Sequence, residues 1–352
     1  MPHERLTCLV PTHNRPLFLR RFLGFYARFR PEFSFLIVDS SCPVAAAENR
    51  SVIDHIRSEL NIRYEHSDLP FYEKIAANFD RVTSPFVVLC ADDDYLLPEA
   101  VSRCVDFLEV EQGYATAMGH KALLNTTKNR WTGRLKVLKG YSIEYDRPLD
   151  RCRHMATQWM SNFYAVNRTE ALYRDFQIVS VMSNSKSLSQ IPEMLMSQLS
   201  VIRGRAKVLP MMYSVWQRHA TNCTNTVAKS IQPLAEQFYK EFNECLSSQL
   251  SQVGIDRVDA ARYVDDWHGS FRYPDFTRRR QLRSTGEHVV RVLRGIAERA
   301  ADFIWTDRVR HCRSVQSRDL VGCETTWHAA VQLMRDFPHG IPADQAVLKR
   351  SA

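Results

Sequence analysis

Residues 85–98 read PFVVLCADDDYLLP and carry the strongest structural signal in the chain. The segment Pro85–Ala91 is almost wholly apolar and rich in valine, as expected of a central parallel strand that is buried on both faces. Asp92, Asp93 and Asp94 follow at once, and Pro98 then favours the first turn of a helix. The pattern predicts a buried strand that brings three carboxylates to one edge of a sheet.

Similar alternations of apolar runs and helical repeats precede this stretch. The apolar runs are 6–10, 33–38 and 62–65, and apolar residues at helical spacing follow at 16–29, 45–60, 69–82 and, after the aspartates, 98–111. This alternation predicts an α/β fold with a mostly parallel sheet flanked by helices. Ligands of such sheets bind beyond the carboxyl ends of the strands, which is where the aspartates lie.

The 352 residues are enough for two domains. We expect an α/β domain over residues 1–225 and a mainly helical C-terminal region over 226–352, with an apolar helical stripe at 289–304. Ten arginines between 278 and 313 supply much of the net charge of +8. Such a block suits an acidic partner, an anionic membrane surface or nucleic acid, or it is a solvated helix face. It lacks the interleaved aromatic residues of a nucleic-acid platform, so no nucleic acid is expected.

The sequence shows neither a secretory signal nor an apolar run of about 20 residues that would span a bilayer. The expected location is therefore the cytoplasm, and the basic C-terminal region allows a peripheral contact with the inner face of the membrane. Nine cysteines are scattered without a CxxC pair, so a zinc site is not expected.

The three adjacent aspartates suggest a cation. Neighbouring carboxylates repel one another, and Mn²⁺ or Mg²⁺ relieves this repulsion because hard ions prefer oxygen ligands and are often shared with phosphates. The alternative is a polar loop or helix cap before Pro98. The first strand–helix junction, PTHNRP at 11–16, has neither GxGxxG nor GxxxxGK[ST], so a bound nucleotide must be held by side chains and metal.

Three segments together resemble a known family: LVPTHNRPLFLRRFL at 9–23, FLIVDSS at 35–41 and FVVLCADDDYLLPEAV at 86–101 are similar to the GT-A glycosyltransferases, especially the family-2 type. The resemblance covers 5–110 well and 150–220 loosely. It implies a GT-A (Rossmann-like) fold. It also implies a metal-dependent, inverting enzyme that moves a sugar from a nucleotide-diphosphate donor to a hydroxyl of a saccharide or glycolipid acceptor, in bacterial surface polysaccharide or glycoconjugate synthesis.

The resemblance also implies roles for individual residues around the donor. Pro11 and Thr12 match the loop that lines the nucleotide base, Asp39 matches the acid that hydrogen-bonds the base, and Lys74 stands where a polar nucleotide contact is common. In the triplet, Asp93 fits the ribose contact, Asp94 the metal ligand and Asp92 a variable place that we assign to the metal. The family often has an acid at the place of Ala91, so the roles within the triplet stay open.

Further candidates lie near the end of the resembling region. Glu193, at the expected start of a helix, is either the general base or a favourable acid in a first helical turn. His219 is either a further metal or diphosphate contact or a structural residue, and Arg218 could stabilise the leaving diphosphate. The segment with Trp159, Asn162 and Tyr164 is either part of an acceptor floor or core packing, and core packing is favoured for Tyr164.

Two other functions compete with sugar transfer. A nucleotidyltransferase shares a related α/β domain, but the PTHNRP loop lacks the glycines usual in that class. A non-catalytic scaffold would dock through the basic helical C-terminal region.

We also expect Glu170 to form a capping box with Asn167.

Overall fold

The computed structural model describes residues 4–127, 133–157, 160–182, 190–222, 235–270, 315, 319–320 and 322–342. Trp159, the arginine block at 278–313 and the apolar stripe at 289–304 therefore lie outside the described residues.

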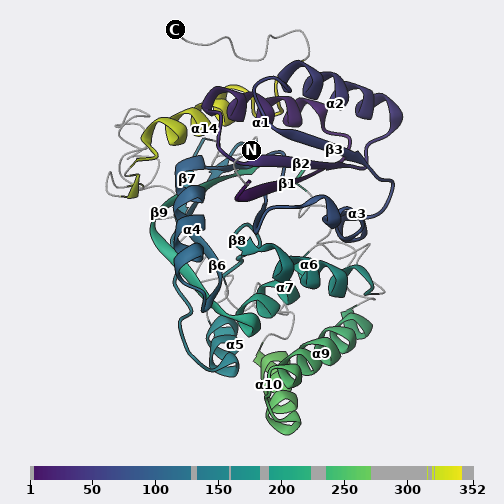
Figure 1. Ribbon diagram of the computed structural model, residues 1–352, viewed down its shortest axis with the longest axis vertical. Coiled ribbons are helices and arrows are strands. Elements are labelled where there is room, and N and C mark those ends of the chain that lie inside the picture. The colour runs from purple at the N-terminus through teal and green to yellow at the C-terminus, as the bar shows by residue number, and fades with distance from the viewer. Residues whose placement is uncertain are drawn as a thin grey trace, which may run out of the picture.

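The first 110 residues form the alternating strands and helices that the sequence predicts (Figure 1). They run β1 (Leu6–Thr12), α1 (Pro16–Phe29), β2 (Ser34–Asp39), α2 (Pro43–Ile56), β3 (Ile62–His66), α3 (Phe71–Ala77), the 3₁₀ turn η1 (Phe79–Arg81), β4 (Phe86–Leu89), β5 (Tyr95–Leu96) and α4 (Pro98–Val110). The helix expected at 69–82 ends early, at Ala77. The side chain of Asn78 donates to the carbonyl oxygen of Lys74 at 2.8 Å, a local bond that competes with the helical ladder.

The rest of the described chain adds strands to the sheet and helices around it. These elements are β6 (Tyr114–Asn125), β7 (Leu135–Leu138), α5 (Pro148–Thr157), β8 (Val166–Arg168), α6 (Thr169–Ser180), α7 (Gln190–Arg203), β9 (Arg205–Arg218), α9 (Ala235–Gln252), α10 (Arg257–Ser270) and α14 (Glu324–Asp336). The predicted capping box is wrong. Arg168 is the N-cap of α6, while the amide of Asn167 donates to the Ala165 carbonyl oxygen at 2.6 Å.

The described strands form one sheet in the order β3-β2-β1-β4-β8-β6-β9-β5, with β7 paired to β6. Strands β3, β2, β1 and β4 are parallel, as predicted. The other half is mixed, because β8 is antiparallel to both β4 and β6 and β5 is antiparallel to β9. The prediction of a mostly parallel sheet thus holds for the first half only. The repeat of strand and helix on which it rested stops after α4.

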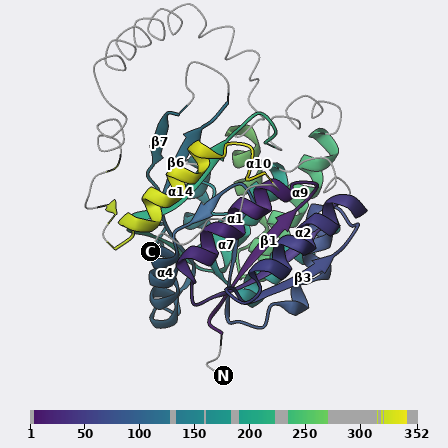
Figure 2. The same ribbon diagram turned by 90° about the horizontal axis from the view of Figure 1, so that it is seen from above.

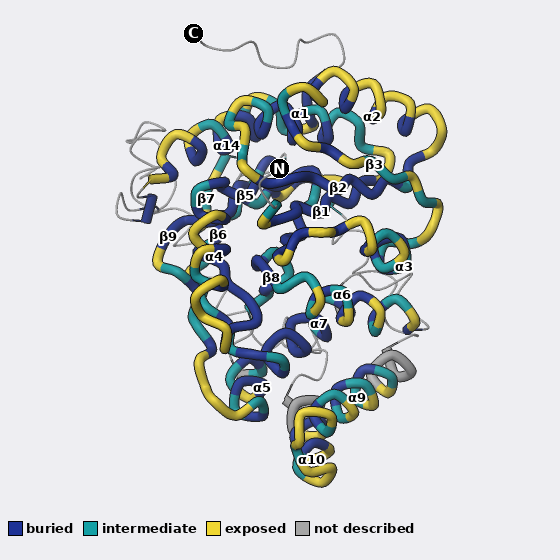
Figure 3. Tube along the Cα trace, viewed as in Figure 1, coloured by how far each residue is buried: buried dark blue, intermediate teal, exposed yellow. Residues whose placement is uncertain are grey.

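Helices cover both faces of the sheet. In Figure 1, α1, α2 and α14 lie above the strands, and α3, α6 and α7 lie below them. The strand β1 serves both sides, because Cys8 and Val10 belong to the core under α1 while Leu9 belongs to the core on the opposite face. Figure 3 shows the resulting pattern, with buried strands and with exposed residues along the outer sides of α1 and α2.

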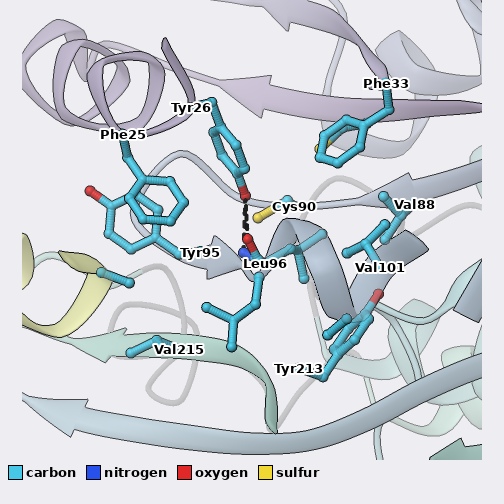
Figure 4. Packing of buried hydrophobic residues seen from close by; sticks show 14 of the residues in the cluster. Phe25, Tyr26, Phe33, Val88, Cys90, Tyr95, Leu96, Val101, Tyr213 and Val215 are labelled. Carbon is cyan, nitrogen blue, oxygen red and sulfur yellow. Dashed lines mark hydrogen bonds between the residues drawn. The ribbon is translucent and has the colours of Figure 1, made fainter. Parts of the chain in front are cut away.

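A cluster of aromatic residues fixes the chain just after the three aspartates (Figure 4). The Tyr26 hydroxyl donates to the Leu96 carbonyl oxygen and accepts from the Leu96 amide, both at 3.0 Å. The rings of Phe25 and Tyr95 pack with centroids 4.4 Å apart. Because Tyr95 directly follows Asp94, this packing restrains the position of the third carboxylate.

The C-terminal helices pack against the α/β domain on two sides. Helix α14 lies beside α1 (Figure 2) and also packs near β9. The indole of Trp327 is fully buried in the same core as α1. Helices α9 and α10 pack on α7 and α5, where the Tyr263 hydroxyl donates to the Cys152 carbonyl oxygen at 3.0 Å. In the part of the chain that the structure describes, no helix combines the length and the apolar character needed to cross a bilayer.

Candidate functional site

The carboxyl ends of β1, β2 and β4 meet at one edge of the sheet. Thr12 and Asp39 are partners in the register of β1 and β2, and β4 lies on the other side of β1. The Thr12 hydroxyl donates to Oδ2 of Asp92 at 2.7 Å, so the first strand contacts the acidic loop directly. The structure therefore brings Thr12 and the three aspartates together, as the sequence predicts.

Asp92 and Asp93 share one arginine. The exposed fractions of the two residues are 1% and 4%. Nη1 of Arg15 lies 3.0 Å from Oδ1 of Asp92, and Nη2 lies 2.6 Å from Oδ2 of Asp93. Sequence reasoning missed Arg15, although it lies within the quoted PTHNRP segment, because 77 residues separate it from Asp92.

The two carboxylates differ in their proton affinity. Burial raises the pKa of Asp92 to about 6, even though Arg15 and the Thr12 hydroxyl favour its charged form. Burial acts against ionisation of Asp93 as well, but hydrogen bonds from His219 and Arg15 bring the pKa of this residue down to about 2. Asp93 is thus the firmly ionised member of the pair.

Asp94 faces a different part of the fold. Its Oδ1 accepts the Gln217 backbone amide at 2.7 Å, and its Oδ2 accepts the Tyr164 hydroxyl at 3.0 Å. Burial raises the pKa of Asp94 well above its usual value, and the neighbouring charge of Asp93 adds to this. The sequence favoured core packing for Tyr164, but its hydroxyl lies at the site, where it contacts Asp94 and the Ala91 amide.

His219 lies against the second aspartate. Its Nε2 is 2.7 Å from Oδ2 of Asp93, its Nδ1 is 2.9 Å from the Thr221 hydroxyl, and its ring stacks on Phe18 with centroids 4.9 Å apart. The neighbouring Arg218 has an exposed side chain, while its carbonyl oxygen accepts the Thr126 amide at 2.8 Å. Both predicted residues are thus near the triplet in the fold, and His219 touches it.

The predicted nucleotide contacts hold one another in a fixed frame. Asp39 is fully buried, and its carboxylate accepts bonds from the Ser41 amide at 2.7 Å, from Asn49 at 2.8 Å and from the Tyr64 hydroxyl at 2.7 Å. Burial acts against ionisation of Asp39, but these hydrogen bonds keep its pKa below the ordinary value. Pro11 is buried at the end of β1. Asn49 and Tyr64 were missed, since nothing in the sequence relates them to Asp39.

Lys74 ties the first two strand ends together. Its Nζ donates to the Thr12 carbonyl oxygen at 2.8 Å and to the Ser40 hydroxyl at 2.9 Å. Burial lowers the pKa of Lys74 to about 8, although Asp39 and Asp92 favour its charged form. His13 and Asn14, in contrast, are exposed at this edge. Asn14 takes a φ of +53° and its Oδ1 accepts the Cys42 amide at 2.8 Å.

Glu193 lies on the other side of Tyr164, in the first turn of α7. Its Oε1 accepts the Ser161 hydroxyl, and the amine of Lys121 donates to the Ser161 carbonyl oxygen. Lys121 also lies 4.4 Å from the ring centroid of Trp216, which packs against Tyr164. Glu193 is thus linked to Asp94 through a short series of contacts. Lys121 and Trp216 were not singled out by the sequence.

The charges in this second cluster are strongly perturbed. Burial raises the pKa of Glu193, opposed by the Ser161 hydrogen bond and the charge of Lys121. Burial lowers the pKa of Lys121 to about 8, opposed by Glu193 and Asp94. Perturbed pKa values of this kind cluster at functional sites. Asn162, by contrast, is buried and donates to the Ser200 hydroxyl at 2.5 Å, which is a packing role.

The donor set suits a hard cation chemically, but its arrangement does not. Within the described ranges, no three His, Cys, Asp or Glu side chains converge as they would around a metal ion. Asp94 turns towards Gln217 and Tyr164, and the cation that contacts both Asp92 and Asp93 is Arg15. The side chains as placed do not fit a divalent ion.

The fold can be compared with known structures. The chain matches crystal structures of residues 1–349 of TarS from S. aureus over 94% of its own length and 89% of theirs. For one of these structures the TM-score is 0.53 at 16% identity. For the complexes with UDP-GlcNAc and with UDP it is 0.52, at 16% and 15% identity.

The fold is of the GT-A type. This confirms the architecture implied by the sequence resemblance. Against a longer TarS chain the match spans 45% of that chain. No protein-family model matches the sequence, and no curated protein matches it either.

Proposed function

We propose that this chain is a glycosyltransferase that moves a sugar from a nucleotide-diphosphate donor to an acceptor hydroxyl. One observation carries the proposal. The carboxyl ends of β1, β2 and β4 present an acidic edge, formed by Asp92, Asp93 and Asp94, and a partly buried glutamate with a raised pKa, Glu193, lies near it. The contacts that link Glu193 to this edge run through Ser161, Lys121, Trp216 and Tyr164. The shared fold supports it, because TarS has been crystallised with UDP-GlcNAc and with UDP.

The donor nucleotide is proposed to lie over the ends of β1 and β2. Asp39, Lys74 and Thr12 brace the two loops there, and His13 and Asn14 are exposed on top of them. A uridine nucleotide is the first to test, given the ligands of TarS. The diphosphate would then point towards the triplet, where Arg15 and Arg218 supply positive charge for the leaving group.

Glu193 is proposed as the general base. It would take the proton of the acceptor hydroxyl, while the hydroxyl oxygen attacks the anomeric carbon and the bond from that carbon to the diphosphate oxygen breaks. The diphosphate leaves with the bonding electron pair, so the configuration at the anomeric carbon inverts. The raised pKa of Glu193 suits a base that works near neutral pH.

The remaining features stay predictions from the sequence. The acceptor is proposed to be a saccharide or glycolipid in surface polysaccharide or glycoconjugate synthesis. The cytoplasmic location and the peripheral membrane contact also stay predictions. The sequence also predicts Mn²⁺ or Mg²⁺, but the described side chains do not fit the ion, so the proposed reaction contains no step through it.

Donor binding and turnover test the proposal separately. Calorimetry with UDP and GDP identifies the base, and release of UDP from UDP-GlcNAc with a panel of acceptors measures transfer. Glu193→Gln should lower turnover by about 10²–10⁴-fold while UDP binding stays within about twofold of the wild type. Glu170→Gln is the matched control, because Glu170 also sits in the first turn of a helix but is exposed. Normal turnover in Glu193→Gln would refute the role of the base.

A further inference from the structure

Arg15 stands at the junction of the two strands that form the acidic edge. It ends the loop after β1, directly before the first helical residue, Pro16. Strands β1 and β4 are parallel neighbours, so the loop after β1 and the loop with the three aspartates leave the sheet side by side. The fold therefore places a guanidinium opposite Asp92 and Asp93.

The guanidinium is positioned as a fork. Its two terminal nitrogens reach different carboxylates, Asp92 at 3.0 Å and Asp93 at 2.6 Å. Its carbon lies 4.4 Å from the ring centroid of Phe18, the same ring on which His219 stacks. A planar, delocalised cation held against an aromatic face is a geometry that arginine provides and lysine does not. The side chain is held in place by both contacts.

The guanidinium compensates the negative charges of Asp92 and Asp93, which are both buried. Oδ1 of Asp92 is a buried atom that no donor reaches with hydrogen-bond geometry, so its ion pair with Arg15 is what offsets its charge. Burial acts against the charge of Arg15, yet the fields of Asp92 and Asp93 raise its pKa further. Arg15 therefore stays charged at any pH where the protein is folded.

We propose that Arg15 is the resident cation of the acidic edge and does there what a divalent ion would otherwise do. With the guanidinium in place, the apo protein does not take up Mn²⁺ or Mg²⁺ at Asp92 and Asp93, and the donor diphosphate binds without a metal. The proposal rests on the proposed function only for the identity of the donor. The side chain of Arg15 is 25% exposed, so part of the cation remains open to a phosphate oxygen.

The test compares metal and nucleotide binding in the full-length chain. The free Mn²⁺ signal in electron paramagnetic resonance measures metal binding to the apo protein, and calorimetry measures UDP binding in EDTA and in Mn²⁺. The wild type should take up little Mn²⁺, and its affinity for UDP should be the same within about twofold in both buffers. In Arg15→Gln, Mn²⁺ uptake should rise and Mn²⁺ should restore UDP binding by about tenfold or more, since a small divalent ion can enter the vacated place.

Matched variants separate this effect from a loss of charge or of folding. Arg28→Gln removes the same charge from an exposed position on α1 and should behave as the wild type. Arg15→Lys keeps one positive charge without the fork, and it should fold and bind UDP more weakly but still independently of metal. This variant keeps the test open if Arg15→Gln does not fold.

Several results would overturn the proposal. Mn²⁺ uptake by the wild-type apo protein that Asp92→Asn abolishes would do so, as would UDP binding by the wild type that needs Mn²⁺. Equal Mn²⁺ uptake by the wild type and a folded Arg15→Gln would do so as well. If UDP fails to bind under every condition, the proposed donor is wrong, while the Mn²⁺ titration of the apo protein still decides the role of Arg15.

Discussion

The Tyr164 hydroxyl donates to Oδ2 of Asp94 over 3.0 Å and at the same time accepts the backbone amide of Ala91 over 3.2 Å. One side chain from the segment before β8 thus holds both ends of the acidic loop. The Tyr164 ring also packs against the ring of Trp216. The amine of Lys121 lies 4.4 Å from the centroid of that Trp216 ring. The donor edge and the cluster around Glu193 are therefore mechanically joined at this phenol.

Tyr164→Phe should destabilise the acidic loop while the packing of the ring in the core is kept. The variant leaves the Ala91 amide and Asp94 each without one buried partner, which typically costs about 1–3 kcal/mol. Urea denaturation should show this loss, and donor binding should weaken. Tyr145→Phe removes a hydroxyl from a half-exposed ring and is the control. Unchanged stability in Tyr164→Phe would mean that water or another group replaces the phenol.

Lys121→Met should shift the acidic limb of the pH–rate profile to higher pH. The charge of Lys121 favours the ionised form of Glu193, so removing it raises the pKa of Glu193 further. The base is active only when it is deprotonated. As the pH is lowered, the rate of the variant should therefore begin to fall at a higher pH than the rate of the wild type. Measuring kcat between mildly acidic and neutral pH checks this. A limb that moves to lower pH would exclude the assigned electrostatic coupling.

Trp327→Ala should destabilise the α/β domain and not only α14. The indole is fully buried in the core that also contains Phe22 and Tyr26, and such truncations cost about 3–5 kcal/mol. Thr325→Ala, at an exposed position of the same helix, should change stability by no more than about 0.5 kcal/mol. A single unfolding transition that shifts as a whole is expected. Loss of α14 in a separate, earlier transition would contradict it.

Gly340→Ala should be more harmful than Gly254→Ala, although both residues have a positive φ, at +88° and +84°. A Cβ at residue 340 would lie 2.3 Å from the backbone carbon of Leu17, whereas one at residue 254 would have no neighbour within 4 Å. The strained backbone alone costs about 1–2 kcal/mol. Overpacking should add about 1–3 kcal/mol at residue 340. Equal urea midpoints for the two variants would argue against the close approach.

The parts of the fold that the sequence predicted well are those with local signals. The valines of 86–89 predicted a buried strand, and Pro98 predicted the first turn of the helix that follows. The acidic loop could be placed at the sheet edge because its position depends only on where the preceding strand ends. The mixed half of the sheet could not be predicted, because the pairing of β8 between β4 and β6 depends on contacts between distant segments.

The candidate site divides in the same way. Thr12 ends β1 and the aspartates follow shortly after the end of β4, so these residues lie where the strand ends predict a site. Arg15 lies in a segment that was singled out, but its ion pairs cross 77 and 78 residues, as counted from Arg15 to Asp92 and Asp93, and no spacing rule reveals them. Lys121 was overlooked because a lysine within an apolar strand is normally assigned to its solvent-facing side. Only packing shows that this amine is buried.

Arg21 connects two carbonyl oxygens, that of Asp93 and that of Phe337, each at 2.8 Å. The second bond spans 316 residues. A ribosome synthesises the chain from its N-terminus, so β1, β4 and the aspartates leave the exit tunnel long before the segment that follows α14. During that interval the nascent chain lacks the hydrogen bond from Arg21 to Phe337, while the bond to Asp93 and the contacts of Arg21 with the rings of Phe18 and Tyr95 involve segments already made. The full set of contacts at this edge therefore forms only after the segment that follows α14 has been synthesised.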